Sequence, residues 1–247
     1  MSTIQQVVSA PQNAAPQSTL KGVKDIVLVH GAFADGSCWS KVIAQLQAKG
    51  YNVIAVQNPL TSLHDDAAAA RRAIAQMEGP VLLVAHSYGG MVISEAGNDP
   101  KVAGLLYVAA LVPEEGQNVN DVNAAMPTTG VEREMQLSPE GFLSLPLKGI
   151  NEFFAQDASP EERKVIFATQ GGWAASATQG KVHSPAWMTK PTWAIVAAKD
   201  RMINPDLERF KAKLIKATTI ELPSSHVPMI SQPDKVSEFI ISAAGQL

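Results

Sequence analysis

The chain has 247 residues, of which 20 are basic and 23 are acidic, so its formal net charge is −3. This weak negative charge, without any run of Lys or Arg, excludes nucleic acid and anionic membranes as electrostatic partners. The single cysteine, Cys38, excludes an internal disulfide framework, and no apolar run approaches the roughly 20 residues of a membrane-spanning helix. We therefore expect a soluble, cytoplasmic protein.

The first 20 residues differ in composition from the rest. Residues 1–20 are rich in Gln, Ser, Ala and Pro and carry no charged side chain. A secretory signal would need a basic start and an apolar stretch of about 7–15 residues. We interpret 1–20 as a flexible N-terminal arm, with a trimmed remnant of an export signal as the alternative, and 21–247 as a single domain.

From Lys24 onward, short apolar runs alternate with segments of helical spacing. The runs that predict strands are 25–30, 51–56, 80–85, 104–111, 192–198 and 217–222. The segments that predict helices are 39–49, 64–77, 88–96, 205–216 and 233–244. Strands that are apolar on both faces and alternate with helices indicate an α/β protein with a parallel, doubly wound sheet.

The stretch from about 113 to 191 interrupts this alternation. Pro and Gly punctuate it, and the pieces at 149–156 and 160–169 are short and amphipathic. We expect an insertion without sheet. An insertion of this length is usually functional, so the pattern predicts a lid or cap.

The sharpest local motif is AHSYGG at 85–90, between a predicted strand and a predicted helix. A serine on such a tight turn is exposed at the carboxyl edge of the sheet, and small neighbours allow the backbone to approach closely. The motif makes Ser87 a candidate nucleophile. It is short enough to occur by chance, so a structural turn serine is the alternative interpretation.

A serine nucleophile needs a base and an acid that orients the base. Asp200 follows the fifth predicted strand, and His226 follows the sixth. This order, Ser then Asp then His, is the one that the strand–turn–helix topology requires. Glu114 or Glu115, after the fourth strand, is the alternative acid.

The first strand ends in the motif HGAF at 30–33. The backbone N–H groups of Ala32 and Tyr88 are candidate donors to an oxyanion, with the N–H of Phe33 as the alternative to Ala32. Gly31 suits a position where the main chain must approach closely. His30 is expected to brace this turn.

Taken together, these motifs resemble the α/β-hydrolase superfamily. The resemblance covers about residues 24–245 and rests on HGAF (30–33), AHSYGG (85–90), AAKDRMINP (197–205) and SSHVPMISQP (224–233). Within the superfamily the chain looks most like the branch of plant methylesterases, hydroxynitrile lyases and bacterial esterases of the pyrethroid-hydrolase type. The resemblance implies a Ser87–His226–Asp200 triad, no cofactor, and a minimal six-stranded, mostly parallel sheet with helices on both faces and an inserted helical cap.

The chain departs from the usual serine turn of the superfamily at one position and from the lyase members of the branch at two. Ala85 stands where glycine is commonest, and a methyl group should fit there. Lyase members of the branch carry a lysine directly after the catalytic histidine and a threonine in the first oxyanion turn. This chain has Val227 and Gly31 at those positions. Val227 and Gly31 both favour ester hydrolysis over cyanohydrin cleavage.

Aromatic and sulfur-containing side chains near the predicted motifs are the candidates for a substrate pocket. We expect an apolar cleft lined by Phe33, Tyr88, Phe154, Trp173 and Met229. The remaining histidines, His64, His86 and His183, are interpreted as surface, cap or flanking residues, and Cys38 as a packing residue. The spacing of His, Asp and Glu matches no metal site.

The sequence thus predicts a serine hydrolase that cleaves small, mostly apolar carboxylic esters through an acyl-enzyme, with no cofactor and no metal. A small-molecule receptor, or a lyase, perhydrolase or cofactor-free oxygenase on the same fold, is the alternative. The identity of the ester and the oligomeric state stay open at this point.

Overall fold

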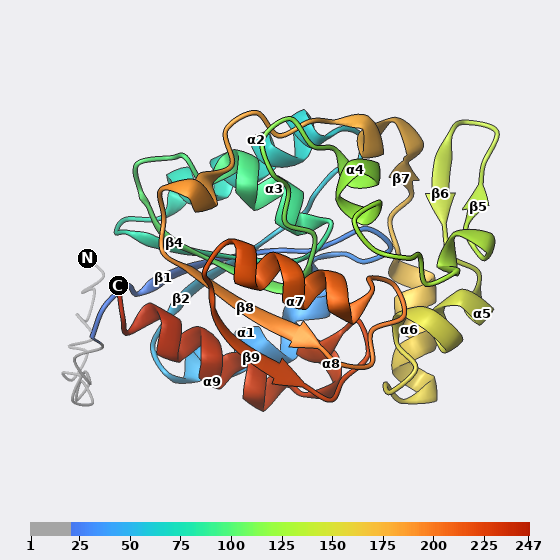
Figure 1. Ribbon diagram of the computed structural model, residues 1–247. Helices are drawn as coiled ribbons and strands as arrows, with labels where there is room; N and C mark the ends of the chain where they lie inside the picture. Colours follow the sequence, from blue (N-terminus) through green and yellow to red (C-terminus); the bar gives the residue numbers. More distant parts are fainter. Residues whose placement is uncertain (1–20) are drawn as a thin grey trace, which may run out of the picture.

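A computed structural model describes residues 21–247, and the predicted arm at 1–20 lies outside the described residues. Within the described range, a six-stranded parallel sheet forms the centre of the fold (Figure 1). Its order is β2-β1-β3-β4-β8-β9. The strands are β1 (Asp25–Val29), β2 (Asn52–Val56), β3 (Val81–Ser87), β4 (Val102–Ala110), β8 (Thr192–Ala197) and β9 (Thr218–Leu222). The predicted α/β fold with six strands is confirmed.

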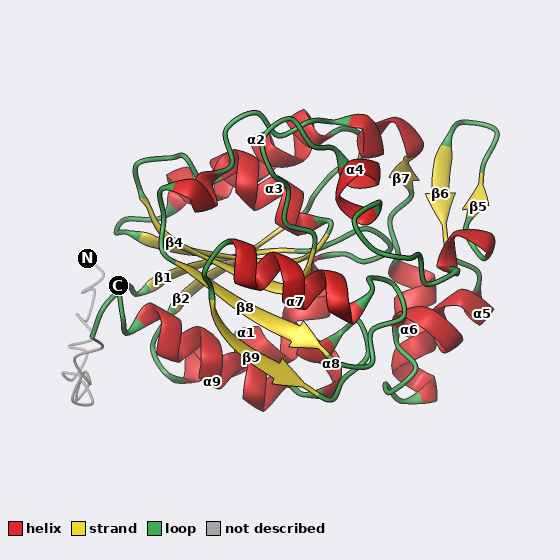
Figure 2. Ribbon diagram, viewed as in Figure 1, coloured by secondary structure: helices red, strands yellow, loops and turns green. Residues whose placement is uncertain are grey.

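Helices cover both faces of this sheet (Figure 2). Helices α2 (Leu63–Gln76) and α3 (Gly89–Ala96) pack together on one face, and α1 (Ser40–Ala48) and α9 (Pro233–Ala244) pack together on the other. Helix α7 (Pro205–Leu214) packs against β8. Every residue of β1 and β3 is buried, which explains why these strands are continuous apolar runs.

The end of β3 differs from the prediction by two residues. The predicted strand stops at residue 85, but His86 and Ser87 continue it and pair with Val108 and Ala110 of β4. Helix α3 then begins at Gly89. Ser87 is therefore the last residue of a buried strand, at the carboxyl edge of the sheet.

The insertion at 113–191 is not free of sheet, so that expectation was wrong. Strands β5 (Gln136–Leu137), β6 (Phe142–Ser144) and β7 (Trp173–Ala174) form a small antiparallel sheet. A turn closed by Gly141, with φ 84°, joins β5 to β6. Strand β7 pairs with β6 from about thirty residues further along the chain, and such a non-local pairing leaves no local signal.

The other elements of the insertion are short helices. They are α4 (Val119–Asn123), η2 (Val131–Arg133), α5 (Leu147–Gly149), the π-helix η3 (Ile150–Phe154), α6 (Pro160–Thr169), η4 (Ala175–Gln179) and η5 (Ala186–Met188). Outside the insertion, η1 (Gly36–Trp39) precedes α1, and α8 (Pro228–Ser231) precedes α9. The amphipathic segment predicted at 160–169 matches α6.

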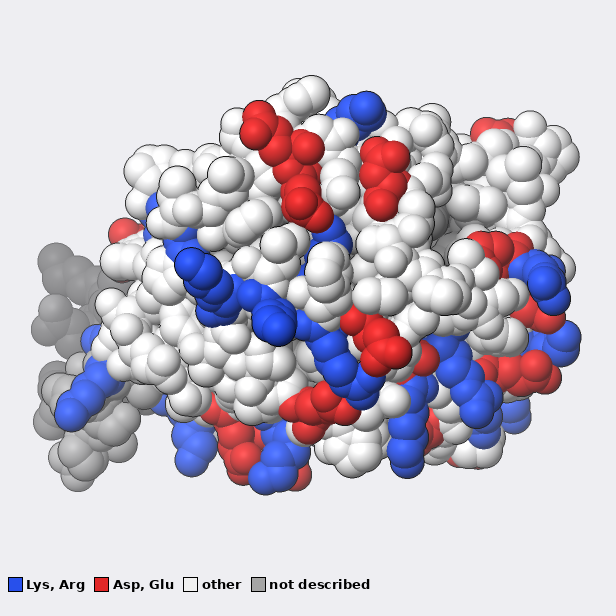
Figure 3. All heavy atoms as spheres, viewed as in Figure 1, with Lys and Arg blue, Asp and Glu red and all other residues white. Residues whose placement is uncertain are grey.

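The surface of the protein mixes both signs of charge. On the face drawn in Figure 3, basic side chains form a band across the middle, acidic side chains lie above it, and both signs mix along the lower edge. No helix within residues 21–247 combines the length and the apolar character needed to cross a membrane.

Candidate active site

Ser87 lies on a turn that only small neighbours allow. Its φ of 56° is in the left-handed region, which places its side chain at the tip of the strand-to-helix turn. A Cβ at Gly90 would lie 2.1 Å from the carbonyl oxygen of Leu111, and one at Gly89 would lie 2.9 Å from that of Val29. These close approaches explain the two glycines that follow in AHSYGG.

The loops after β8 and β9 bring Asp200 and His226 to Ser87. His226 Nε2 lies 2.8 Å from Ser87 Oγ, and His226 Nδ1 lies 2.5 Å from Asp200 Oδ2. The other carboxylate oxygen of Asp200 accepts hydrogen bonds from the backbone N–H groups of Met202 and Ile203, at 2.6 and 3.0 Å. The three residues that the sequence predicts as a triad thus form one hydrogen-bonded chain.

The alternative acid has a different partner. The Glu114 carboxylate lies 2.8 Å from the ammonium group of Lys211, whose side chain is buried in α7. The carboxylate in contact with His226 is that of Asp200. The structure therefore favours Asp200 over Glu114 as the partner of the histidine.

Two residues that the sequence did not indicate hold the His226 loop in place. His86 Nε2 donates to the carbonyl oxygen of His226 at 2.8 Å, and Asp157 of the insertion accepts from the N–H of Ser225 at 2.7 Å. The pKa of His86 lies well below its ordinary value, mainly because the ring is buried and secondly because the His226 ring is near. This imidazole is therefore neutral. His64 and His183 are exposed, as predicted.

The predicted oxyanion donors lie on the turns after β1 and β3. In the described part of the chain, no backbone carbonyl accepts a hydrogen bond from the N–H of Ala32 or of Tyr88. A Cβ at Gly31 would lie 2.5 Å from Ser87 Cβ and 3.1 Å from Ser87 Oγ. Glycine at this position thus lets the turn approach Ser87. Phe33, next to Ala32, has a φ of 59°.

Two buried hydrogen-bond pairs fix these turns. His30 Nε2 accepts from the N–H of Asn58 at 2.9 Å, and the Asn58 amide donates to the His30 carbonyl at 2.8 Å. These hydrogen bonds support the predicted bracing role of His30. The hydroxyl of Tyr88 donates to Asp66 Oδ2 at 2.9 Å. Burial raises the pKa of Asp66 to about 6.

A cavity of about 440 Å³ opens above Ser87. Phe33, Tyr88 and Trp173 line it, as predicted. The Trp173 ring lies edge-on to the Phe33 ring, with the centroids 5.8 Å apart, and its centroid lies 5.0 Å from that of the Tyr88 ring. Most of the remaining lining comes from the insertion and from the loop after β8, including Val119, Val131, Met135, Leu143, Met202 and Ile203. Asn120, Asn123 and Glu132 add polar groups.

Phe154 and Met229 do not line this cavity, so the prediction for these two residues is corrected. Phe154 packs behind the site, edge-on to the rings of His226 and His86 at centroid distances of 5.3 and 6.2 Å. Met229 lies on α8 and is fully buried in the core. A place in the insertion, for Phe154, or in the loop of His226, for Met229, did not indicate whether the side chain faces the cavity.

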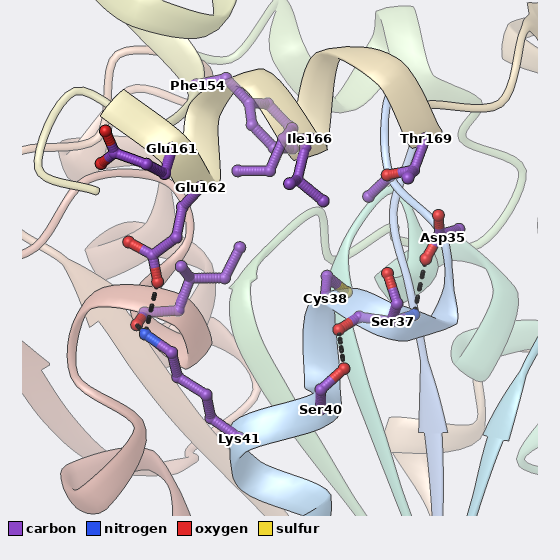
Figure 4. A pocket seen from close by; sticks show the side chains of 13 residues that line it. Asp35, Ser37, Cys38, Ser40, Lys41, Phe154, Glu161, Glu162, Ile166 and Thr169 are labelled. Atoms are coloured by element: carbon purple, nitrogen blue, oxygen red, sulfur yellow. Dashed lines mark hydrogen bonds and ion pairs between the residues drawn. The ribbon is translucent and has the colours of Figure 1, made fainter. Parts of the chain in front are cut away.

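A second cavity, of about 270 Å³, is lined by Phe154 and by residues of η1, α1 and α6 (Figure 4). Phe154 and Ile166 line it, and an ion pair between Lys41 and Glu162, 2.6 Å long, lies beside it. Cys38 also lines this cavity, and burial raises the pKa of its thiol. This supports the prediction that Cys38 is a packing residue.

Ser87 thus lies at one end of a hydrogen-bonded chain of side chains and at the wall of a mostly apolar cavity. Within residues 21–247, no three His, Cys, Asp or Glu side chains gather as metal ligands would.

Comparison with known proteins places the chain in a family. The model of the alpha/beta hydrolase family matches residues 26–239. A probable hydrolase of Phoma sp. is 25% identical over 89% of this chain and 98% of its own length. The pyrethroid hydrolase of Sphingobium wenxiniae is 27% identical over 90% of this chain and 88% of its own. A crystal structure of a pyrethroid hydrolase, 24% identical, superimposes with a TM-score of 0.78 over 90% of this chain and 97% of its own. The chain belongs to the alpha/beta hydrolase family.

Proposed function

We propose that the protein is a serine hydrolase that cleaves small, mostly apolar carboxylic esters through an acyl-enzyme intermediate. The observation that carries the proposal is the hydrogen-bonded chain from Ser87 Oγ through His226 to Asp200, with distances of 2.8 and 2.5 Å. Ser87, at one end of this series of hydrogen bonds, lines a cavity that can hold a small ester. Two relatives that match over nearly the whole chain are named hydrolases, which supports the same reaction class.

The reaction follows from this geometry. His226 Nε2 takes the proton of Ser87 Oγ while the oxygen attacks the ester carbonyl, and Asp200 stabilises the imidazolium that forms. The N–H groups of Ala32 and Tyr88 bind the oxyanion of the tetrahedral intermediate. His226 then gives the proton to the leaving alcohol, and the acyl group stays on Ser87.

The second half of the reaction releases the acid. His226 takes a proton from a water molecule, whose oxygen attacks the acyl-enzyme, and returns the proton to Ser87 Oγ as the bond to the acid breaks. The protein supplies base, acid and oxyanion donors from its own residues, so the proposed mechanism needs no cofactor.

The lining of the cavity supports apolar acyl or alcohol groups. Phe33, Trp173 and Leu143 present carbon surface to the cavity. In the proposed reaction, the insertion at 113–191 serves as the cap over the substrate. One relative is named a pyrethroid hydrolase. We infer a substrate class of small, neutral esters rather than anionic ones.

The test is hydrolysis of p-nitrophenyl acetate together with labelling by a fluorophosphonate probe. Ser87→Ala should lower kcat by about 10⁴-fold or more and abolish labelling. Cys38→Ala, which removes the one thiol, is the matched control and should keep both. Undiminished hydrolysis by Ser87→Ala would refute the proposal. Lack of turnover across a broad ester panel, beside tight binding of a small ligand, would favour a receptor instead.

A further inference from the structure

A buried glutamate lies directly behind the triad. Glu208 is in the first turn of α7 and is only 5% exposed. Its Oε2 accepts a hydrogen bond from the N–H of Ala197, the last residue of β8, at 2.9 Å. Its Oε1 is buried and receives no hydrogen bond from a donor within residues 21–247. The carbonyl oxygen of the same Ala197 accepts the N–H of Asp200 at 3.0 Å, so Glu208 and Asp200 are both anchored on this residue and their buried carboxyl groups are neighbours.

Two neighbouring carboxyl groups that are both buried do not both ionise, because neither water nor a counter-ion offsets their repulsion. Asp200 accepts three hydrogen bonds, from Met202, Ile203 and His226. Glu208 accepts one, from Ala197. Since hydrogen-bond donors stabilise the charged form of a carboxyl group, the negative charge belongs on Asp200 and the proton on Glu208.

The surroundings of Glu208 agree with this assignment. Burial and the charge of Asp200 raise the pKa of Glu208 well above its ordinary value. The adjacent Arg209 points its guanidinium to Asp206 and Glu221 at the surface. Tyr107 of β4, which lines the same small cavity as Glu208, is hydrogen-bonded to Ser94. Neither side chain supplies a charge in direct contact that would hold Glu208 ionised.

We propose that Glu208 is a positioning residue whose protonated carboxyl donates a hydrogen bond to the Asp200 carboxylate, extending the chain Ser87–His226–Asp200 by a fourth member. The proton fits on Oε1, because Oε2 is already an acceptor. This bond fixes the orientation of Asp200 toward His226 Nδ1. It also keeps a single negative charge behind the histidine. The inference rests on the proposed serine mechanism.

Two substitutions of similar size separate the donated hydrogen bond from mere packing. Glu208→Gln keeps a neutral donor, and its kcat should stay within about threefold of wild type. Glu208→Met fills the space without a donor. Its kcat should fall by about tenfold or more with KM changed less than about twofold, since positioning is lost and substrate contacts are not. Asp206→Asn, in the same turn of α7 but exposed, is the control for effects on the helix.

The protonation state is measured directly, so the test does not depend on how well the Met variant folds. Infrared spectra at pH 7 should contain the carbonyl stretch of a buried, protonated carboxylic acid that disappears in Glu208→Gln. Absence of that band in the wild type would overturn the proposal. So would equal kcat losses in the Gln and Met variants at matched thermal stability, or an unchanged kcat in the Met variant. Failure of the serine mechanism itself is recognised separately, by an active Ser87→Ala variant.

Discussion

Asp200 Oδ2 lies 2.5 Å from His226 Nδ1, and neither side chain has any exposed surface. A carboxylate in this position fixes which nitrogen of the imidazole carries the proton, so that the other nitrogen faces Ser87 as a base. In the proposed mechanism, His226 is therefore held in one tautomer before any substrate is bound.

Replacement of this carboxylate should disable the base while leaving the fold intact. In Asp200→Asn the neutral amide neither holds His226 in the tautomer protonated at Nδ1 nor stabilises the imidazolium. The kcat for p-nitrophenyl acetate should therefore fall by about 10⁴-fold. The matched control is Glu114→Gln, because Glu114 is the other candidate acid but contacts Lys211. A larger loss of kcat in Glu114→Gln than in Asp200→Asn would show that Glu114, and not Asp200, is the acid that orients His226.

The contact between Gly31 and Ser87 gives a second prediction. A methyl group at residue 31 would lie 2.5 Å from Ser87 Cβ, which requires the turn or the serine to move. Gly31→Ala should therefore lower kcat by about 10- to 1,000-fold, through displacement of the nucleophile and the oxyanion donors. Gly245→Ala, where a methyl group meets only ordinary contacts at 3.4 Å or more, is the control. Equal activity of the two variants would contradict the proposed placement of the oxyanion turn.

Asp66 should make the stability of the protein depend on pH. Its pKa is about 6 in the folded state against 3.8 ordinarily, so the folded protein binds the proton more tightly. The resulting stabilisation is fully present below pH 3.8 and is lost as the pH rises through 6. The loss is at most about 3 kcal/mol, since one pKa unit corresponds to about 1.4 kcal/mol.

Urea unfolding of wild type and Asp66→Asn at several pH values measures this effect. Asparagine does not titrate, so the variant should gain stability relative to wild type between pH 4 and pH 7. A difference between the two proteins that stays constant over this range would show that Asp66 titrates normally.

Trp173 should restrict the size of the substrate. Its ring lines the cavity between Phe33 and Tyr88, and Trp173→Leu would enlarge the space above Ser87. The ratio of kcat/KM for p-nitrophenyl octanoate to that for the acetate should rise by about tenfold, because a pocket distinguishes methylene groups by about 1–3 kcal/mol. Trp187→Leu, also in the insertion but outside the cavity, should leave the ratio unchanged. An equal ratio in both variants would count against Trp173 as a size determinant.

The sheet and the three residues at its edge were predictable because their signals are local. A buried parallel strand is a continuous apolar run, and parallel strands end at the same edge of a sheet. Residues that follow such runs, namely Ser87, Asp200 and His226, are therefore brought together by topology alone. The close approach at Gly31 follows from the same reasoning.

The cavity lining was only partly predictable, because it depends on contacts between distant segments. Strand β7 pairs with β6 across a long stretch of chain, and this pairing carries Trp173 to the cavity. Phe154 packs against the ring of His226 and Met229 is buried in the core, so neither side chain reaches the cavity. Hydrogen bonds between distant residues, such as the one from Tyr88 to Asp66 and the one from His86 to the carbonyl oxygen of His226, have no pattern in the sequence either.

The left-handed backbone at Ser87 has a thermodynamic consequence. A non-glycine residue with a φ of 56° costs the native state about 1–3 kcal/mol, and glycine adopts this conformation without that cost. Ser87→Gly should therefore yield an inactive protein that unfolds at a higher temperature than wild type, whereas Ser87→Ala should not. The difference in melting temperature between these two inactive variants measures how much stability the chain gives up in order to hold a hydroxyl at this turn.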